Sequence, residues 1–588
     1  MTDINFVLRS VVDMADLLSS PDYEGIDVDT VEMVLAEVGR FMAEVVAPTD
    51  RIGDTMGSVQ QSDGSVVTPD GFREAYRLYV ESGFGAIPFD PEHGGGGFPW
   101  TVAIAIQELM CSANMSFSLC PLLTQGAIDA IGHHGSAEQQ ERYLPKMLTG
   151  EWTGTMNLTE PQAGSDVGAL TSKAEPVGDG SFRITGQKIF ITFGEHDMAE
   201  NIIHLVLART PGSAPGTRGI SMFLVPKFLL NEDGSLGDRN DVRCVSIEHK
   251  LGIHGSPTCV LSYGDEGGAL GWLVGEEGDG MKNMFTMMNN ARLSVGLQGL
   301  SLAERAYQKA LAYATERKQG TAVGAERGTS SPIIDHADVR RLLMTQRSWI
   351  DAMRCLIYTN AYTLDQASQG AGTDEGQAAR ERAELLIPLS KGLCTDLGSE
   401  LTSMAIQIHG GMGYVEETGV AQHYRDARIA PIYEGTNGIQ AADLVGRKLP
   451  MRAGGVVFDE LDAADAVADR LAANDDLKLF GQQLGLAVGA ARRATEWLLA
   501  NGALDPNHAL AASSPYLRLL GTVVCGSLMA TMALEAAEGE EGDEEFRRAK
   551  VVSARFFGEQ ILPTAVGLES SITAGAEDLF ALSADQLR

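Results

Sequence analysis

The most chemically suggestive feature of the sequence is a lone carboxylate in a short apolar stretch. Glu434 directly follows Ile432 and Tyr433, and Gly435 comes next. A carboxylate with apolar neighbours is poorly hydrated, so its charged form is disfavoured and its pKa can rise toward the operating pH. The glycine lets a large ligand approach the backbone closely. We therefore predict that Glu434 is a buried general base beside a bound ligand.

A second polar segment, Asn157–Asp166, lies where helical periodicity gives way to strand periodicity. It combines the hydroxyl of Thr159, the acid Glu160, a proline turn and Gly164, which exposes backbone N–H groups. Donors of this kind can bind the carbonyl and phosphate oxygens of a cofactor. The segment therefore predicts a cofactor-binding loop.

The composition is that of an ordinary globular protein with a strong acidic excess. Of 588 residues, 44% are hydrophobic and 21% are charged, so long disordered segments are not expected. The 79 acidic and 45 basic residues give a formal charge of -34, which repels polyanions. We expect no nucleic-acid partner, although local arginines and helix N-termini can still bind a small anion.

The cysteines and the N-terminal residues indicate the cellular compartment of the protein. The seven cysteines are scattered, with no C-x-x-C pair and no histidine at metal-ligand spacing, which indicates a reducing compartment and no metal site. The N-terminus resembles neither a signal peptide nor a transit peptide, and no uninterrupted apolar run reaches membrane-spanning length. We therefore expect a cytoplasmic protein with no integral membrane association.

Hydrophobic periodicity divides the chain into successive segments. The period is that of helices before about Thr149, falls to two between Gly154 and about Trp272, and is helical again from Met281. The predicted parts are a lead-in over 1–27, a helical domain over 28–153, a β-domain over 154–275, a helical bundle over 276–450 and an extra helical domain over 455–588. Because strands and helices do not alternate, a doubly wound α/β fold is excluded and the fold class is mainly α with a central β-domain.

Four separated motifs together resemble those of the acyl-CoA dehydrogenase family. They are Asn157–Asp166, Glu316–Gly320, Gln407–Tyr414 and Tyr433–Asn437, in the family's order and spacing, so the resemblance covers about residues 30 to 450. It implies an N-terminal helical domain, a middle β-barrel or sandwich and a C-terminal four-helix bundle. The added helices resemble those of long bacterial members, such as broad-range fatty acyl-CoA dehydrogenases and 3-methylmercaptopropionyl-CoA dehydrogenases, which implies a homodimer.

The resemblance also implies a reaction. Family members use FAD to introduce a trans double bond between the α and β carbons of an acyl-CoA thioester, and they pass electrons to an electron-transferring flavoprotein. Glu434 matches the base that removes the α proton while the β hydrogen leaves as hydride to flavin N5. The base position that other members use, just before Arg292, is Ala291 here. The site must exclude water and polarise the thioester, which the family does with the backbone N–H of Glu434 and a ribityl hydroxyl.

Binding residues follow from the same resemblance. The positions that match cofactor contacts are Met156, Leu158, Thr159, Gly164, Ser165, Phe190, Thr192, Arg317, His336, Gln407, Gly410, Gly411, Thr436 and Asn437. The positions that match acyl-CoA contacts are Ser165, Asn289, Arg292, Tyr433 and Gly435. Arg317 and Gln407 to Gly411 match elements that reach the FAD of a neighbouring subunit. Phe190 stands where tryptophan is usual, which keeps an aromatic wall but loses an N–H.

Three questions stay open at the level of sequence. An acyl-CoA oxidase, in which O2 reoxidises the flavin, would use the same residues. A DNA-associated homologue with little activity would need a basic C-terminal surface, whereas acidic residues outnumber basic ones beyond Pro450. Medium or long straight acyl chains are the default substrate and short thioether chains the alternative. Met281, Met284, Met287 and Met288 could line an acyl pocket, although their helical spacing favours ordinary core packing.

Overall fold

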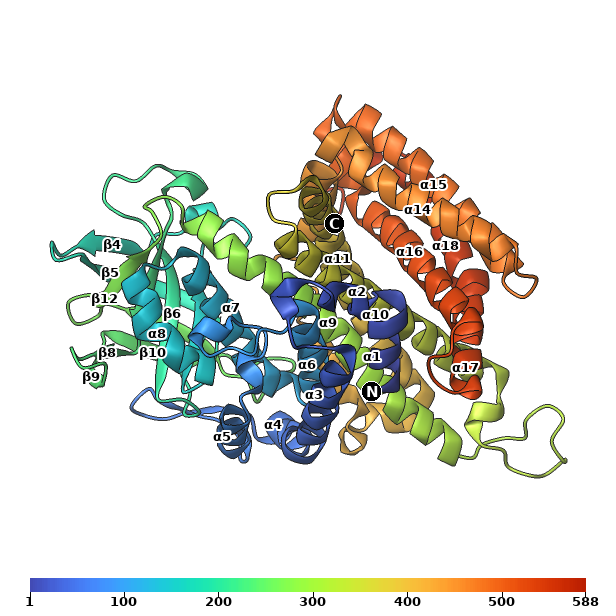
Figure 1. Cartoon of the computed structure of the whole chain (residues 1–588), viewed down its shortest axis with the longest axis horizontal. Helices are drawn as coiled ribbons and strands as arrows, with labels where there is room; N and C mark the ends of the chain where they lie inside the picture. Colours follow the sequence, from blue (N-terminus) through green and yellow to red (C-terminus); the bar gives the residue numbers. More distant parts are fainter. The chain divides into compact units, whose positions relative to one another are not determined.

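The structure is a computed structural model that describes residues 1–588, apart from the side chains of Thr286 and Asn289. It divides into two compact units, which we call the sheet unit, Glu37–Ser294, and the bundle unit, Met1–Ala36 with Val295–Arg588. Figure 1 shows their helices and strands. The strands belong to the sheet unit, and long helices make up the bundle unit. The predicted mainly helical fold with a central β-domain is confirmed.

Helices precede the main sheet of the sheet unit. Their bounds are Val28–Phe41 for α3, which begins in the bundle unit, Asp50–Met56 for α4, Phe72–Ser82 for α5, Trp100–Ala113 for α6, Met115–His134 for α7 and Ala137–Thr149 for α8. Helices α6 and α7 are apolar around most of their circumference and are accordingly buried. Helix α8 begins at a capping box formed by Ser136 and Gln139 and ends at Gly150, whose φ is 86°.

The sheet runs in the order β10-β11-β5-β12-β7-β6-β3, and β4 pairs with β5. The strands are β3 (Trp152–Asn157), β4 (Lys173–Pro176), β5 (Ser181–Thr192), β6 (Asn201–Ala208), β7 (Ser221–Pro226), β10 (Val242–Ile247), β11 (Thr258–Tyr263) and β12 (Ala269–Val274). Short hairpins pair β1 (Val59–Gln60) with β2 (Val66–Val67) and β8 (Phe228–Leu230) with β9 (Leu236–Arg239). Strand β3 runs parallel to β6, and the other pairings named here are antiparallel. Strands β3, β6 and β7 are buried at every residue, so both of their faces are covered.

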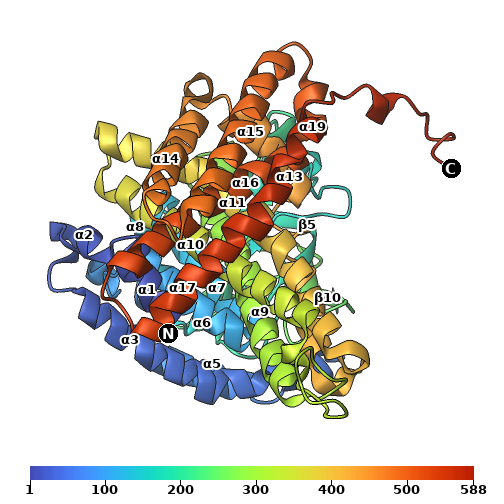
Figure 2. The same cartoon turned by 90° about the vertical axis from the view of Figure 1, so that its right-hand side faces the viewer.

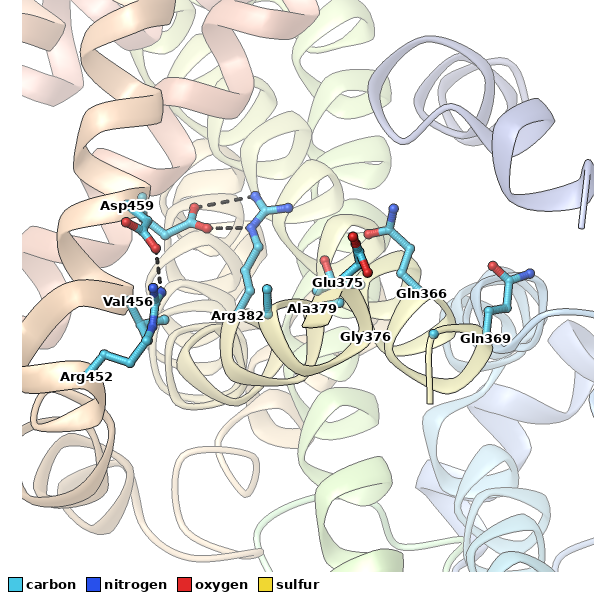
Figure 3. Close-up of a pocket in the computed structure, with 13 residues that line it drawn as sticks. Gln366, Gln369, Glu375, Gly376, Ala379, Arg382, Arg452, Val456 and Asp459 are labelled. Carbon is cyan, nitrogen blue, oxygen red and sulfur yellow. Dashed lines mark hydrogen bonds and ion pairs between the residues drawn. The ribbon is translucent and has the colours of Figure 1, made fainter. Parts of the chain in front are cut away.

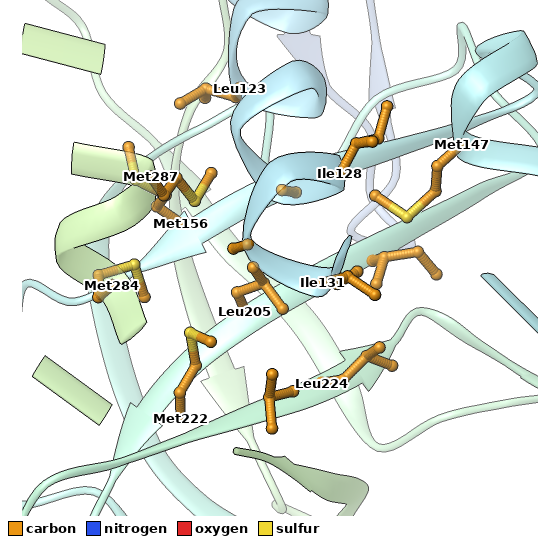
Figure 4. Close-up of a cluster of buried hydrophobic side chains, with 14 of the residues drawn as sticks. Leu123, Ile128, Ile131, Met147, Met156, Leu205, Met222, Leu224, Met284 and Met287 are labelled. Carbon is orange, nitrogen blue, oxygen red and sulfur yellow. The ribbon is translucent and has the colours of Figure 1, made fainter. Parts of the chain in front are cut away.

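A large hydrophobic cluster fills the space between α7, α8, the sheet and the first turns of α9 (Figure 4). Ile128 and Ile131 of α7 face Leu205 of β6 and Leu224 of β7 in this cluster. The methionines of α9 join it: Met284 and Met287 are fully buried, and Met281 and Met288 pack against it. The cluster thus fixes the start of α9 against the sheet.

The bundle unit is built from helices much longer than those of the sheet unit. They are α9 (Gly280–Glu316, which begins in the sheet unit), α10 (Ala337–Gln369) and α11 (Asp374–His409), followed by the short α12 (Val420–Ala427) and α13 (Asn437–Asp443). The loops between α9, α10 and α11 contain glycines, such as Gly320 and Gly370, which break the helical periodicity. Helices α9 and α11 approach closely because glycines meet: a Cβ on Gly398 would lie 2.7 Å from the Cα of Gly299.

The C-terminal extension packs against α10, α11 and α13. Its helices are α14 (Gly455–Ala472), α15 (Lys478–Gly502), α16 (Pro506–Glu538), α17 (Glu544–Phe556), α18 (Leu562–Val566) and α19 (Leu568–Ile572). Figure 2 shows α16 beside α15, and α16 also contacts α10, α11 and α13. A Cβ on Gly392 of α11 would lie 2.7 Å from the Leu517 side chain of α16, so this approach is as close as side chains allow.

Helix α16 is long and apolar enough to cross a membrane by length and composition alone. The sequence contains no uninterrupted apolar run of that length, so this helix was not predicted from the sequence. However, 78% of its most apolar window is buried inside the chain, which is typical of a core helix. Among the side chains that the structure describes, no group of three or more histidine, cysteine, aspartate or glutamate residues could hold a metal ion.

The first residues, to which the sequence alone assigns no role, anchor the extension. They form α1 (Thr2–Phe6) and α2 (Met14–Leu18) within the bundle unit. Asp3 of α1 pairs with Lys550 of α17 at 2.6 Å and with Arg347 of α10 at 2.7 Å. Lys550 also pairs with the fully buried Asp351 at 2.7 Å. The N-terminus therefore closes a buried ionic cluster between α10 and α17.

Candidate active site

The loop that carries Glu434 connects α12 to α13 and has a constrained backbone. Glu434 has a φ of 54° and Gly435 a φ of 79°, so two consecutive residues lie in the left-handed region. This conformation costs a residue with a side chain about 1–2 kcal/mol. Surrounding contacts must therefore hold it. The Glu434 side chain is partly buried, less than the fully buried base that the sequence suggested.

Contacts from α11 hold this loop. The fully buried Lys391 donates to the carbonyl oxygen of Gly435 at 2.8 Å and to Oδ1 of Asn437 at 2.8 Å. The Asn437 amide donates in turn to the carbonyl oxygen of Gly392 at 3.0 Å and to Asp396 at 2.7 Å. Asn437 thus lies against α11, and a cofactor contact through this residue stays a prediction.

The residues that flank the base also have defined partners. The Tyr433 hydroxyl donates to the buried Gln298 of α9. Thr436 caps α13, because its Oγ1 accepts a backbone N–H of the first turn at 3.2 Å. Gln440 Nε2 donates to the carbonyl oxygen of Glu434 at 3.2 Å. These bonds fix the loop at both ends.

The end of the bundle where α9 and α11 finish gathers the residues that match the adenosine half of the cofactor. They are Arg317 directly after α9 and Gln407, Gly410 and Gly411 at the end of α11, all of them exposed. His409 stacks on Tyr313 with ring centroids 4.4 Å apart, which joins the two helix ends. His336 lies with Nε2 2.8 Å from the carbonyl oxygen of Gln319, so it fixes the loop after Arg317 rather than pointing freely toward a ligand.

The cofactor loop of the sheet unit is anchored to β5 by a buried ion pair. Lys188 Nζ lies 2.8 Å from Glu160 Oε1, and both side chains are inaccessible to solvent. Two backbone N–H groups just before β4 also donate to Glu160, and the Ile189 N–H donates to the Thr159 carbonyl oxygen at 2.9 Å. The loop is therefore held against β5 at Lys188 and Ile189.

The electrostatics of this pair follow from burial and mutual attraction. Burial raises the pKa of Glu160, but the charge of Lys188 and the hydrogen bonds outweigh it and bring the pKa to about 2. Burial lowers the pKa of Lys188 to about 8, against the opposite effect of Glu160. Both groups are therefore charged at neutral pH.

Phe190 occupies a bulge in β5. Cys259 of β11 pairs with Ile191 and Leu261 pairs with Lys188, so two residues of β5 lie opposite one residue of β11. Phe190 adopts a φ of 60° in this bulge and is 58% exposed. Strain combined with an exposed aromatic ring indicates a surface shaped for a partner rather than for the core.

The remaining predicted contacts have varied environments. Met156 is buried in β3, Leu158, Thr159 and Thr192 are partly buried, and Gly164 and Ser165 are exposed at the turn of the cofactor loop. Arg292 is buried on α9, with its guanidinium carbon 5.6 Å from the ring centroid of Phe285. The side chain of Asn289 lies outside the described residues.

The two units each contain a cavity of different character. One in the bundle unit has a volume of about 670 Å³ and is lined by α10, α11 and α14 (Figure 3). Its arginines are paired with carboxylates, Arg382 with Glu460 and Arg452 with Glu381, so it offers little to an anionic ligand. The other, in the sheet unit, is only about 10 Å³ and lies among Trp100, Gln107, Met156, Met287 and neighbours. Neither cavity is lined by Glu434.

Comparison with known proteins identifies the class. Family models match consecutive parts of the chain: the acyl-CoA dehydrogenase N-terminal domain at 29–151, the middle domain at 155–265, the C-terminal domain at 278–449 and an acetyl-CoA dehydrogenase C-terminal-like domain at 459–583. The chain belongs to the acyl-CoA dehydrogenase family.

Similarity to individual members extends over the full length, including the extension. The chain is 45% identical to 3-methylmercaptopropionyl-CoA dehydrogenase of Ruegeria pomeroyi, over 99% of this chain and 98% of that protein. It is 34% identical to a broad-specificity linear acyl-CoA dehydrogenase of Mycobacterium tuberculosis, over 98% and 97%. The fold is also that of an acyl-CoA dehydrogenase from Bacillus anthracis complexed with FAD, with a TM-score of 0.73, 21% identity and coverage of 97% and 91%. The predicted enzyme class, an acyl-CoA dehydrogenase, is thereby confirmed.

The family is FAD-dependent, and the residues present fit that cofactor. Phe190 offers an exposed aromatic wall, which suits a flat ring system. The exposed Ser165 and the partly buried Thr159 add hydroxyl donors along the same loop. At the bundle end, the exposed guanidinium of Arg317 suits a pyrophosphate. The predicted cofactor, FAD, agrees with this donor set.

Sequence reasoning missed the residues that support the site. Lys188 occupies an inward position of a strand, and Lys391 lies within the apolar run Leu385–Leu393 of a long helix. A lysine at a core position is almost never fully buried unless it is paired, so this placement was the available signal. The partners of Lys188 and Lys391 could not be identified from the sequence because they are up to 46 residues away.

Proposed function

We propose that this protein oxidises an acyl-CoA thioester to the trans-2-enoyl-CoA, with Glu434 as the base that accepts the α proton. The observation that carries the proposal is the backbone of Glu434: a carboxylate residue is held at a positive φ by contacts from α11 and α13. Strained residues that are over-determined by their surroundings are typical of functional sites. The family membership supports the reaction class.

The cofactor and the residues of the site have different roles in the proposed reaction. Bound FAD supplies the two-electron acceptor for the hydride that leaves the β carbon. The carboxylate of Glu434 takes the proton from the α carbon, so the C–H electron pair is free to form the new double bond. Partial burial of Glu434 limits the access of water to that carboxylate. By the family resemblance, Tyr433, Gly435 and Arg292 would contact the thioester end of the substrate, and Ser165 would contact CoA.

For the acyl group we propose a short chain. The small cavity of the sheet unit is lined by apolar side chains, such as Trp100 and Met287, and by the polar Gln107. Gln107 is tied to Ser294 at 2.6 Å and to Gln125 at 2.8 Å, so lengthening the cavity there would break buried hydrogen bonds. The relative from Ruegeria pomeroyi is named for a short thioether acyl group. Methionine flexibility allows the cavity to open around such a chain.

Partners and location complete the proposal. Electrons pass from the reduced cofactor to an electron-transferring flavoprotein, and the protein works as a cytoplasmic homodimer in which the exposed Arg317 and the glycines at 410 and 411 reach the partner's FAD. Their exposure at one end of the bundle supports this arrangement. The acidic surface implied by the charge of -34 repels nucleic acid.

A panel of acyl-CoA thioesters, scored by anaerobic bleaching of the bound flavin, tests the function and the chain length together. We expect the fastest reduction with chains of about four carbons or a short thioether chain. Equal reduction by long chains would reject the chain-length proposal, and no bleaching by any thioether or straight-chain substrate would reject the reaction. Release of one hydrogen peroxide per turnover under air would show that the enzyme is an acyl-CoA oxidase rather than a dehydrogenase.

A further inference from the structure

We propose that Lys391 and Asn437 are positioning residues for Glu434: they form a buried clamp that sets the direction of its carboxylate. This inference rests on the proposed function, since it assumes that Glu434 is the base. We call the Lys391 ammonium, the Asn437 amide and the turn of α11 that they join the base clamp.

The burial of Lys391 needs an explanation. It lies on α11 at 0% exposure, and a buried ammonium must recover through close acceptors what it loses in hydration. Two such acceptors, the Gly435 carbonyl oxygen and Asn437 Oδ1, both belong to the loop of the base and both lie at 2.8 Å. The charge of Lys391 therefore faces the residues directly after Glu434.

Asn437 completes the clamp. Its Nδ2 donates to α11 at the Gly392 carbonyl oxygen, at Thr395 Oγ1 and at Asp396 Oδ1, with distances of 3.0, 2.9 and 2.7 Å. Its Oδ1 accepts from Lys391. An amide has two N–H groups and one carbonyl oxygen, so its donors and its acceptor are already engaged within the chain. This makes Asn437 a support of the loop rather than a hydrogen-bonding contact of the cofactor.

The backbone shows what the clamp maintains. Glu434 and Gly435 both have positive φ, and a residue with a side chain adopts that region only when its surroundings enforce it. The ammonium binds the carbonyl oxygen of Gly435, which is the peptide group that ends this left-handed pair. Without that bond Glu434 can return to the right-handed region, and its carboxylate changes direction. A base that is displaced by about 1 Å loses roughly a hundredfold in rate.

The test compares Lys391→Met and Asn437→Ala with Lys448→Met. Lys448 lies just after α13 and pairs with Glu384 at 2.8 Å near the surface, so its replacement is a matched lysine-to-methionine change outside the clamp. For each protein we would measure FAD per chain, the midpoint of thermal unfolding, and the rate of anaerobic flavin reduction at saturating acyl-CoA. The rate is measured with ordinary and with α-deuterated substrate, and the substrate concentration for half-maximal rate is recorded.

The base clamp predicts a specific pattern. Both clamp variants reduce the flavin roughly 10- to 100-fold more slowly, keep their FAD, keep the half-saturating concentration within threefold, and show a larger α-deuterium isotope effect because proton removal becomes slower. Lys448→Met stays within twofold of the wild type. A merely structural role would instead lower FAD content and the unfolding midpoint without raising the isotope effect.

Rates within twofold of the wild type in a clamp variant that folds would overturn the inference. If Lys391→Met does not fold, the same criteria apply to Asn437→Ala, which removes the side-chain acceptor of Lys391 and the bonds that hold the loop to α11. Glu434→Gln is measured alongside. If it retains near wild-type flavin reduction, the proposed function itself fails; if it is inactive while both clamp variants are fully active, the clamp alone fails.

Discussion

Replacing Lys188 by methionine tests whether the buried ion pair, rather than the hydrophobic core alone, holds the cofactor loop. The change removes the ammonium 2.8 Å from Glu160 and leaves a carboxylate that is 2% exposed. The lowering of the Glu160 pKa from 4.5 to about 2 corresponds to about 3 kcal/mol in favour of the ionised form. Breaking a buried pair on one side typically costs about 3–5 kcal/mol, which agrees.

Such a loss should appear in both stability and cofactor retention. For a unit of this size, about 3 kcal/mol lowers the unfolding midpoint by roughly 10 °C. FAD content should fall as well, because the loop of Thr159 and Ser165 loses its anchor on β5. Calorimetry on the purified protein and the ratio of flavin to protein absorbance after dialysis would measure the two effects.

The sheet unit offers a matched control. Lys227 pairs with the buried Glu195 in the same unit, outside the cofactor loop Asn157–Asp166, and Glu195 keeps Arg239 as a second partner at 2.9 Å. Lys227→Met should therefore destabilise less and release no FAD. The double variant Lys188→Met with Glu160→Gln should recover part of the lost stability, since no uncompensated charge remains. A midpoint shift below 2 °C with full FAD content in Lys188→Met would refute the anchoring argument.

Three further predictions concern other parts of the chain. Arg317→Ala should lose FAD on extensive dialysis because a charge-assisted contact to the pyrophosphate is removed, and unchanged occupancy would count against that contact. Burial, helped by the charge of Lys227, lowers the pKa of His196 and of His204 to about 3. The unfolded chain binds those protons from about pH 6.5, so the unfolding midpoint should fall as the pH drops from 6.5 toward 3, and a double His→Gln variant should show a shallower fall; identical slopes would contradict this. Lys550→Met should lower the midpoint more than Asp3→Asn, because it removes a buried cation and leaves Asp3 and Asp351 to share Arg347, whereas Asp3→Asn leaves Lys550 and Arg347 both paired with Asp351; equal shifts would argue against the buried cluster.

Periodicity carried the prediction of the fold because it depends only on local sequence. The change from a period of 3.6 to a period of two marked the sheet, and the return of helical periodicity from Met281 marked the bundle. The predicted domain limits at 153, 275 and 450 describe the chain by type of element, whereas compactness groups residues 1–36 with the bundle. That grouping depends on pairings such as Asp3 with Lys550, more than 500 residues apart, which no local pattern encodes.

The candidate site shows the same division between local and long-range information. Glu434 and the cofactor loop were recognised because motif and chemistry are contiguous. The bulge at Phe190 and its positive φ arise from the register of β5 against β11, which a single strand sequence does not reveal. Asn437 was assigned to the cofactor by its motif position, whereas its side-chain partners on α11 could be found only from the three-dimensional structure.

Glu434→Gln is the decisive replacement, because it keeps the size and polarity of the side chain but removes its ability to accept a proton. The variant should purify yellow, with FAD content and unfolding midpoint equal to those of the wild type. Acyl-CoA should still bind, as judged by a perturbation of the flavin spectrum, but anaerobic bleaching should be slower by at least a thousandfold. Bleaching at a rate near that of the wild type would show that another group removes the α proton and would contradict the account.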